Sequence, residues 1–164
     1  MNAEGCEQLW RKHADALLLY ATAILSDRNQ AEDVLQVVFS RILTLEALPS
    51  TSSEAAYLFR AVRNEALNLL RAKGRAERMY HRLLEMIKGL IVEGPSPLED
   101  RSIEIQNALF EIPREQREAV VLKIWGDLSF QEAASMLGVS EKTIEHRYYR
   151  GLAALKDEMD GRYE

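Results

Sequence analysis

The sequence predicts an all-α protein of two small helical domains joined by a linker. Apolar residues recur at three- and four-residue intervals along almost the whole chain, whereas the alternating Val, Ile and Thr runs typical of strands are nearly absent. Pro95 and Pro97 interrupt this pattern, because proline removes a backbone donor and pushes the preceding residue out of helical geometry. We therefore expect a first domain over 1–92, a linker over 93–100 and a second domain over 101–164.

Composition excludes several classes of protein. The chain has 164 residues, of which 47% are apolar and 29% charged, as in globular proteins. It lacks both the run of about 18 apolar residues that a membrane span needs and the layout of a signal peptide, which predicts a cytoplasmic protein without membrane insertion. Cys6 is the only cysteine, and His13, His81 and His146 are scattered. We expect no disulfide, metal, cofactor or catalytic residues, and hence no enzyme.

The charges are unevenly distributed. The formal net charge is −5, yet residues 57–88 hold eight basic and three acidic side chains. A second basic stretch, 142–156, holds Lys142, Arg147, Arg150 and Lys156 against Glu145 alone. Phosphate contacts come from Lys and Arg, so the net charge by itself argues against a nucleic-acid partner, but its distribution leaves two positive stretches in an acidic chain. With so few cations, neither stretch should hold duplex DNA tightly by itself.

Four helices are expected in the first domain. The first covers about 7–25, and the second begins after a capping box of Asp27 and Gln30. Thr51 and Glu54 form a similar pair before a third helix that runs to about residue 73, and a fourth covers about 75–91. The second helix should bury one stripe, made of Ala31, Val34, Leu35, Val38, Ile42 and Leu45.

The second domain carries the sharpest motif of the chain. After helices over about 103–110 and 115–125, Ser129 and Glu132 form a capping box. Ala134, Gly138 and Ile144 then follow at offsets of 0, +4 and +10. The small residue lets two helices approach, the glycine takes the left-handed turn, and the branched residue anchors the second helix. This spacing predicts a helix-turn-helix.

The second helix of this motif is the expected recognition helix. Ser140 caps it, and its exposed side carries groups suited to base edges and phosphates, namely Lys142, Thr143, His146, Arg147 and Arg150. Gly151 lies further along the same helix and has low helix propensity. We expect the helix to bend there.

Over residues 9–155 the chain resembles the extracytoplasmic-function (ECF) group of bacterial RNA polymerase sigma factors. In the first half the resemblance is carried by AEDVLQVVF at 31–39 and by YLFRAVRN at 57–64, with Asn68 and Arg71. In the second half it is carried by GDLS at 126–129, LGVS at 137–140 and TIEHR at 143–147. The chain departs from the family pattern at Tyr57, often tryptophan, at Asn68, usually aspartate, and at Gly151, commonly alanine.

The resemblance implies a transcription initiation factor without enzymatic activity, whose partners are core RNA polymerase, promoter DNA and an anti-sigma protein. It places polymerase contacts on the outward face of the second helix, at Asp33, Gln36, Val37, Ser40 and Arg41. It places contacts to the promoter −10 element at Tyr57, Arg60, Arg63, Asn64, Asn68 and Arg71. It places contacts to the −35 element on the recognition helix, at Ser140, Lys142, Thr143, His146, Arg147 and Arg150.

Two further points follow from the same resemblance. Tyr57 or Phe59 could stack on a base of the opened −10 strand, although Phe59 is equally well explained as a core residue, and the loop over 49–53 could receive an extruded base. Two alternatives stay open on the sequence: a stand-alone helix-turn-helix regulator, and a sigma-like decoy that sequesters an anti-sigma protein.

Overall fold

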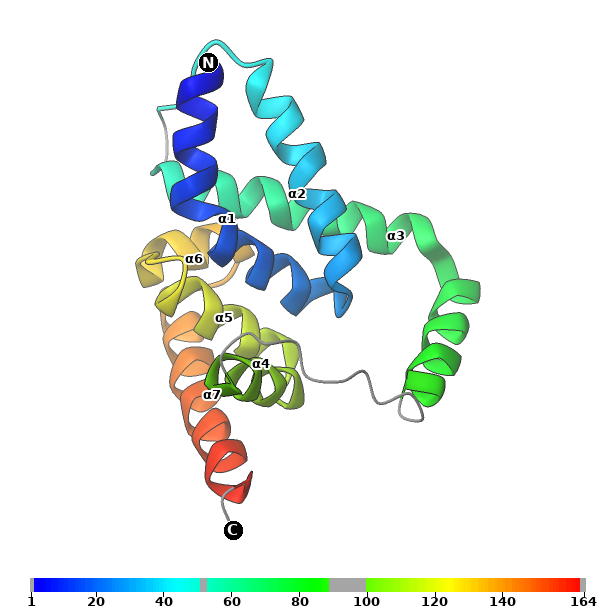
Figure 1. The fold of residues 1–164 in the computed structure, drawn as a ribbon. Helices are drawn as coiled ribbons and strands as arrows, with labels where there is room; N and C mark the ends of the chain where they lie inside the picture. Colours follow the sequence, from blue (N-terminus) through cyan, green and yellow to red (C-terminus); the bar gives the residue numbers. More distant parts are fainter. Residues whose placement is uncertain (1, 51–52, 89–99, 163–164) are drawn as a thin grey trace.

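The computed structural model describes residues 2–50, 53–88 and 100–162, with side chains described outside 73–88, 100–103 and 162. These residues form seven helices and no strand, which confirms the all-α prediction (Figure 1). The helices are α1 (Ala3–Leu25), α2 (Arg28–Leu43), α3 (Glu54–Lys88), α4 (Asp100–Glu111), α5 (Arg114–Ile124), α6 (Phe130–Leu137) and α7 (Glu141–Arg162). No described helix is long and apolar enough to cross a membrane.

Local side-chain caps determine where α1 and α2 begin. The Asn2 side chain accepts a hydrogen bond from the Gly5 N–H at 2.9 Å, so α1 begins at Ala3, a turn earlier than the sequence indicated. Ser26 takes a left-handed conformation, with φ 55°, and ends α1. Asp27 then accepts from the Gln30 N–H at 3.1 Å and opens α2, as predicted.

The buried face of α2 follows the predicted stripe. Ala31, Val34, Leu35, Val38 and Ile42 are buried, whereas Leu45 lies beyond the helix end and is half-buried. Phe39 is buried as well, with its ring edge-on to Trp10 at 4.9 Å between centroids. An aromatic pair between α1 and α2 thus extends the expected stripe.

Helix α3 differs from its prediction at both ends. Its start is capped by Ser53, whose Oγ accepts from the Ala56 N–H at 3.2 Å, and the proposed capping residue Thr51 lies outside the described residues. Glu54 instead accepts from His13 at 2.7 Å and Lys12 at 3.0 Å on α1.

The third and fourth expected helices form one helix, because a single glycine, Gly74, costs only about 1 kcal/mol in a helix. Its far end lies away from the other helices (Figure 1).

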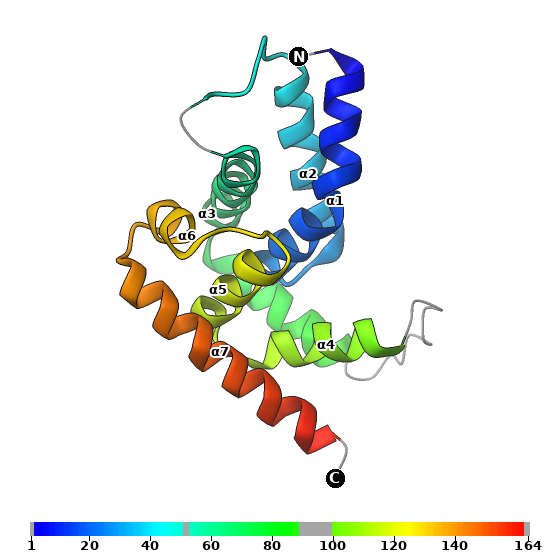
Figure 2. The same cartoon turned by 90° about the vertical axis from the view of Figure 1, so that its left-hand side faces the viewer.

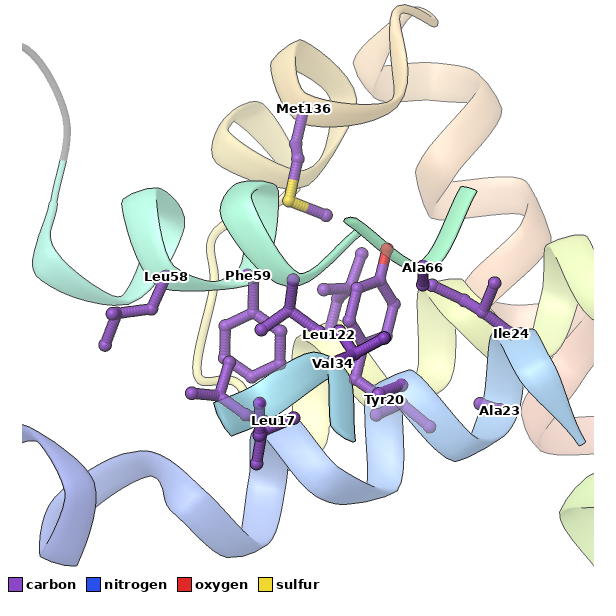
Figure 3. Packing of buried hydrophobic residues seen from close by; sticks show 14 of the residues in the cluster. Leu17, Tyr20, Ala23, Ile24, Val34, Leu58, Phe59, Ala66, Leu122 and Met136 are labelled. Atoms are coloured by element: carbon purple, nitrogen blue, oxygen red, sulfur yellow. The ribbon is translucent and has the colours of Figure 1, made fainter. Parts of the chain in front are cut away.

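The two halves of the chain share one hydrophobic core. Helix α5 packs against α1, and α6 packs against α3 (Figure 2). In Figure 3, Tyr20 of α1 and Phe59 of α3 lie beside Leu122 of α5, with Met136 of α6 reaching toward them. The Tyr20 and Phe59 rings meet edge-on at 5.3 Å. The two halves are therefore packed together as one body rather than held apart.

A glycine permits part of this approach. A Cβ atom on Gly126 would lie 3.0 Å from the Phe59 ring and 2.6 Å from the Leu122 carbonyl oxygen. The left-handed residue of the same turn is Asp127, with φ 52°. Gly126 is thus required by close packing, while the neighbouring aspartate carries the strained backbone conformation.

Arg117 joins the ends of two helices at this interface. The residue is 9% exposed, and its guanidinium donates to four backbone carbonyl oxygens at 2.8–3.1 Å, those of Ala23, Leu109, Phe110 and Ile112. Ala23 lies in the last turn of α1, and Leu109 and Phe110 lie in the last turn of α4. Carbonyl groups in a last helical turn lack intrahelical partners and carry negative partial charge. One arginine therefore satisfies the C-terminal ends of both helices.

Replacing Arg117 by lysine should destabilise the protein strongly. An ammonium group cannot reproduce the planar fork, so several buried carbonyls would lose their donor. We expect the free energy of unfolding to fall by about 3 kcal/mol, measured by urea denaturation at pH 7. The matched control is Arg114→Lys, whose more exposed side chain only approaches Glu118 at 3.6 Å, and it should cost below about 1 kcal/mol. Equal losses in the two variants would contradict the role given to Arg117.

Candidate nucleic-acid interface

The predicted helix-turn-helix is formed by α6, a turn and α7. Ser129 Oγ accepts from the Glu132 N–H at 3.0 Å, and Glu132 Oε2 accepts from the Ser129 N–H at 2.9 Å, which confirms the capping box. Gly138 takes the left-handed conformation at φ 67° and ends α6. Ser140 Oγ accepts from the Thr143 N–H at 3.1 Å and opens α7. Each predicted cap of the motif is thus present.

The anchoring positions of the motif are buried. Ala134 is 4% exposed and Ile144 1% exposed, and both belong to the shared core. Hydrogen bonds from Ser53 and from the Ser129 backbone hold the pKa of Glu132 below its usual value. Because Ser53 also caps α3, this carboxylate links the start of the motif to the first half of the chain.

Helix α7 presents one face of mixed polar and aromatic character. A shallow hollow on it is lined by Lys142, Glu145, His146, Tyr149, Arg150 and Ala153. Three of the predicted recognition residues, Lys142, His146 and Arg150, are exposed here, while Thr143 is half-buried and shares a 2.8 Å hydrogen bond with the Ser140 hydroxyl. The exposed face therefore combines cations with neutral and acidic groups.

Tyr149 belongs to this face and was missed by the sequence analysis. Its side chain is 57% exposed, and its ring packs edge-on against Tyr148 at 5.1 Å. It lies three residues after His146 and seven after Lys142, a spacing that places all three on one side of a helix. The same spacing is visible in the sequence and would have placed Tyr149 on the predicted recognition face.

Arg147 lies toward the flank of the recognition helix. Its side chain is 23% exposed, and its Nη2 lies 3.4 Å from Glu115 Oε2 on α5. The arginine is thus held by an ion pair to the preceding helix, away from the hollow lined by His146 and Tyr149.

Helix α7 continues through Gly151 to Arg162 without interruption. Gly151 allows close helix packing. A Cβ atom there would lie 2.7 Å from Val120 Cγ2 and 3.0 Å from the Gln116 carbonyl oxygen. The missing side chain lets α7 lie close against α5, which fixes the position of the recognition helix.

The exposed stripe of α3 carries most of the predicted −10 residues. Asn64, Asn68 and Arg71 are exposed, and Tyr57 and Arg60, on the same side of the helix, are half-buried. Phe59 lies in the shared core with no exposed surface, so it cannot stack on a base in this arrangement. Of the two aromatic residues considered for stacking, only Tyr57 has accessible surface. Within the 49–53 loop, residues 51–52 lie outside the described part of the chain.

Arg63 points to the second half of the chain. Its Nε lies 3.2 Å from Oε1 of Glu118 on α5, and the same oxygen accepts from the Tyr20 hydroxyl at 2.9 Å. Burial and the adjacent Glu118 charge raise the pKa of Tyr20 well above its usual value, which keeps this hydroxyl protonated as the donor. The sequence could not indicate this contact, since it joins residues far apart in the chain.

The predicted polymerase-contact residues share the outward face of α2. Asp33, Gln36, Val37, Ser40 and Arg41 are all exposed, and Val37 is an exposed apolar residue at 38%. Arg41 Nη1 lies 2.6 Å from Glu65 Oε2 on α3. The described residues contain no group of three or more His, Cys, Asp or Glu side chains that could hold a metal ion.

These features define a class: a two-part helical protein whose second part is a helix-turn-helix of the DNA-binding type. Residues 9–76 match the Sigma-70 region 2 family, and residues 102–155 match the Sigma-70, region 4 family. Together these two matches cover most of the chain, which belongs to the Sigma-70 family of RNA polymerase sigma factors, and its named relatives include members of the ECF group.

Related sequences span most of the chain. The ECF RNA polymerase sigma factor SigE of Mycolicibacterium smegmatis is 31% identical over 156 residues, which cover 92% of this chain and 60% of that relative. The RNA polymerase sigma-E factor of Streptomyces antibioticus is 28% identical over 157 residues, covering 95% of this chain and 85% of the relative. The chain therefore spans less than two thirds of the first relative and most of the second.

Solved structures show the same fold. The sigma factor RpoE of Bartonella quintana, in complex with the anti-sigma factor NepR, aligns with a TM-score of 0.70 at 24% identity, over 94% of this chain and 96% of that one. CnrH in complex with the cytosolic domain of CnrY aligns with a TM-score of 0.63 at 27% identity, over 98% of this chain and 90% of that one.

The packing at Gly151 gives a test of how the recognition helix is positioned. Gly151→Ala should lower the free energy of unfolding by about 1–2 kcal/mol, because the added methyl group overlaps Val120 and outweighs the better helix propensity of alanine. The matched control is Gly161→Ala in the same helix, where a Cβ would meet no atom within 4 Å and the change should be neutral or stabilising. Thermal denaturation of both variants checks this, and stabilisation by Gly151→Ala would contradict it.

The capping box should also contribute to the pH dependence of stability. The pKa of Glu132 is lower in the folded protein than its usual value of 4.5, so its contribution is present above pH 4.5 and is lost as the pH falls through the folded pKa. Denaturation at pH 7, 5 and 3.5 should show a weaker acid dependence in Glu132→Gln than in the wild type. Ser53→Ala, which removes the first of the hydrogen bonds, should give an intermediate profile. Parallel profiles for all three proteins would exclude this role.

Proposed function

We propose that this sigma factor binds core RNA polymerase through the outward face of α2 and directs it to promoters through contacts on α3 and α7. The observation that carries the proposal is the order of the two matched families along the chain, region 2 before region 4, on helices whose proposed contact residues are largely exposed. Under this proposal the protein acts in the cytoplasm, where it positions the polymerase and has no catalytic residues of its own.

We assign the first domain to 1–92, the linker to 93–100 and the second domain to 101–164. Residues 89–99 lie outside the described part of the chain, and α4 already begins at Asp100. The boundary is supported by the family matches, which end at residue 76 and resume at residue 102.

The −35 element would be bound by Ser140, Lys142, Thr143, His146, Arg147 and Arg150 of α7, to which we add Tyr149. Recognition helices of this motif place the side chains of their first turns against base edges in the major groove. Lys142, His146, Tyr149 and Arg150 have the exposure that base or phosphate contact requires. Arg147, paired with Glu115, is better placed for the phosphate backbone beside the groove.

The −10 element would be bound by Tyr57, Arg60, Arg63, Asn64, Asn68 and Arg71 of α3. A single strand is held by cations that follow its backbone and by rings on which bases stack, and Tyr57 is the residue available for stacking. Arg63 is engaged by Glu118 in this arrangement, so it would join the −10 contacts after its ion pair with α5 is exchanged for a phosphate.

An anti-sigma protein is a further proposed partner. The two structural relatives described above are complexes of a sigma factor with, in one case, the anti-sigma factor NepR and, in the other, the cytosolic domain of CnrY. Both align over more than nine tenths of this chain, which supports a partner of the same kind here.

The deciding experiment is run-off transcription with purified core polymerase, with and without this protein, on a set of candidate promoters. Promoter-dependent product in the presence of the protein supports the proposal. Palindromic DNA binding without polymerase would favour a stand-alone regulator, and binding of an anti-sigma protein without transcription would favour a decoy.

Polymerase contact by α2 can be tested with a charge-reversed variant. Asp33→Arg combined with Arg41→Glu keeps the net charge but inverts the pattern on the proposed surface, and co-purification with core polymerase should fall at least about tenfold. The matched control is Glu7→Arg with Arg11→Glu, which swaps an exposed 2.6 Å ion pair on α1 and should bind normally. Undiminished binding of the α2 variant would overturn this assignment.

A further inference from the structure

Glu145 is an acidic side chain on the face of α7 that is proposed to meet DNA. It lines the hollow together with Lys142, His146, Tyr149 and Arg150, and it is exposed. Within the described part of the chain, no hydrogen bond or ion pair of its carboxylate is found. In the sequence Glu145 is the one acidic residue of the basic stretch 142–156, and none of the assigned contacts explains it.

The neighbours of Glu145 along the helix give it little opportunity to stabilise α7. The residue four positions before it is Glu141, a like charge, and the residue four positions after it is Tyr149. Lys142 precedes it by three positions, in the less favourable order of a basic residue before an acidic one. Glu145 is also the fifth residue of α7, beyond the first turn in which the helix dipole favours an acidic residue.

A carboxylate on such a face is unfavourable against phosphates and against most base edges. Guanine presents only acceptors in the major groove, and thymine presents an acceptor beside its methyl group. Adenine presents a donor, but next to the N7 acceptor, which repels a carboxylate. Cytosine alone presents an amino donor without a neighbouring acceptor, and acidic side chains accept hydrogen bonds from it.

We infer that Glu145 is a specificity-determining residue that selects a cytosine in the −35 element by accepting a hydrogen bond from its N4 amino group. Lys142 one turn before it and Arg150 further along the helix supply the positive charge that brings the phosphates of the site close, while Glu145 penalises every other base at its position. This inference rests on the proposed function, because it requires α7 to lie in the major groove of the −35 element.

The test is run-off transcription by core polymerase with the full chain on a library of promoters randomised over the −35 element. Wild type should prefer cytosine at one position by about tenfold over any other base. Glu145→Gln removes the charge but keeps the shape, and an amide pairs with the N6 and N7 atoms of adenine. We therefore expect this variant to lose the cytosine preference and to gain adenine at the same position. The matched control is Asp157→Asn, which removes an equal charge from an exposed position on the same helix, outside the hollow.

Each outcome has a separate meaning. A cytosine preference that is lost in Glu145→Gln and kept in Asp157→Asn supports the inference. An unchanged base profile in Glu145→Gln, or an equal loss in both variants, overturns it while leaving the proposed function intact. The absence of any sequence-dependent product with wild-type protein counts against the proposed function itself, and with it the inference.

Discussion

Two consecutive buried charges on α5, Arg117 and Glu118, hold the two halves of the chain together. Arg117 donates to the carbonyl ends of α1 and α4, whereas Glu118 accepts from Tyr20 and pairs with Arg63. A buried charge that loses its partners costs several kcal/mol, so both sets of contacts favour the packed arrangement of the two halves. Burial lowers the pKa of Arg117, but arginine stays protonated in this setting and remains a donor. The contacts with α1 therefore help to fix the position of α5, and through α5 that of α7.

This junction also separates the proposed −10 residues into two groups. Asn64, Asn68 and Arg71 lie on the open side of α3, while Arg63 reaches across to α5. Separating the halves would free Arg63 but would also expose Phe59 and Tyr20 and remove the Tyr20 and Arg63 donors from Glu118. The free energy for such a rearrangement has to come from contacts made elsewhere, which is what a large partner surface can supply.

The sequence predicted well what is determined locally and poorly what is determined across the chain. The Asp27, Ser129 and Ser140 caps, the Gly138 turn and the buried stripe of α2 each depend on residues within a few positions of one another, and all are present. The start of α1 and the cap of α3 were wrong because several polar residues compete for each cap. The sequence left Phe59 open as either a stacking or a core residue, and the structure places it in the core. The pairing of Arg63 depends on Glu118 of α5, more than fifty residues away, so no local pattern could reveal it. The proposed contact residues themselves remain predictions.

The face of α7 that is proposed to contact DNA carries few charges. The cations that line its hollow are Lys142 and Arg150, with Glu145 between them, while Arg147 lies at the flank and is paired with Glu115. Such a face has little capacity for nonspecific phosphate binding, which grows with the number of neutralised phosphates. Discrimination among bases depends instead on which donors and acceptors of the base edge and of the side chain stay unpaired. A carboxylate increases this discrimination because it is unfavourable against bases that present acceptors. A protein with net charge −5 can therefore be selective for sequence while relying on a partner for most of its affinity.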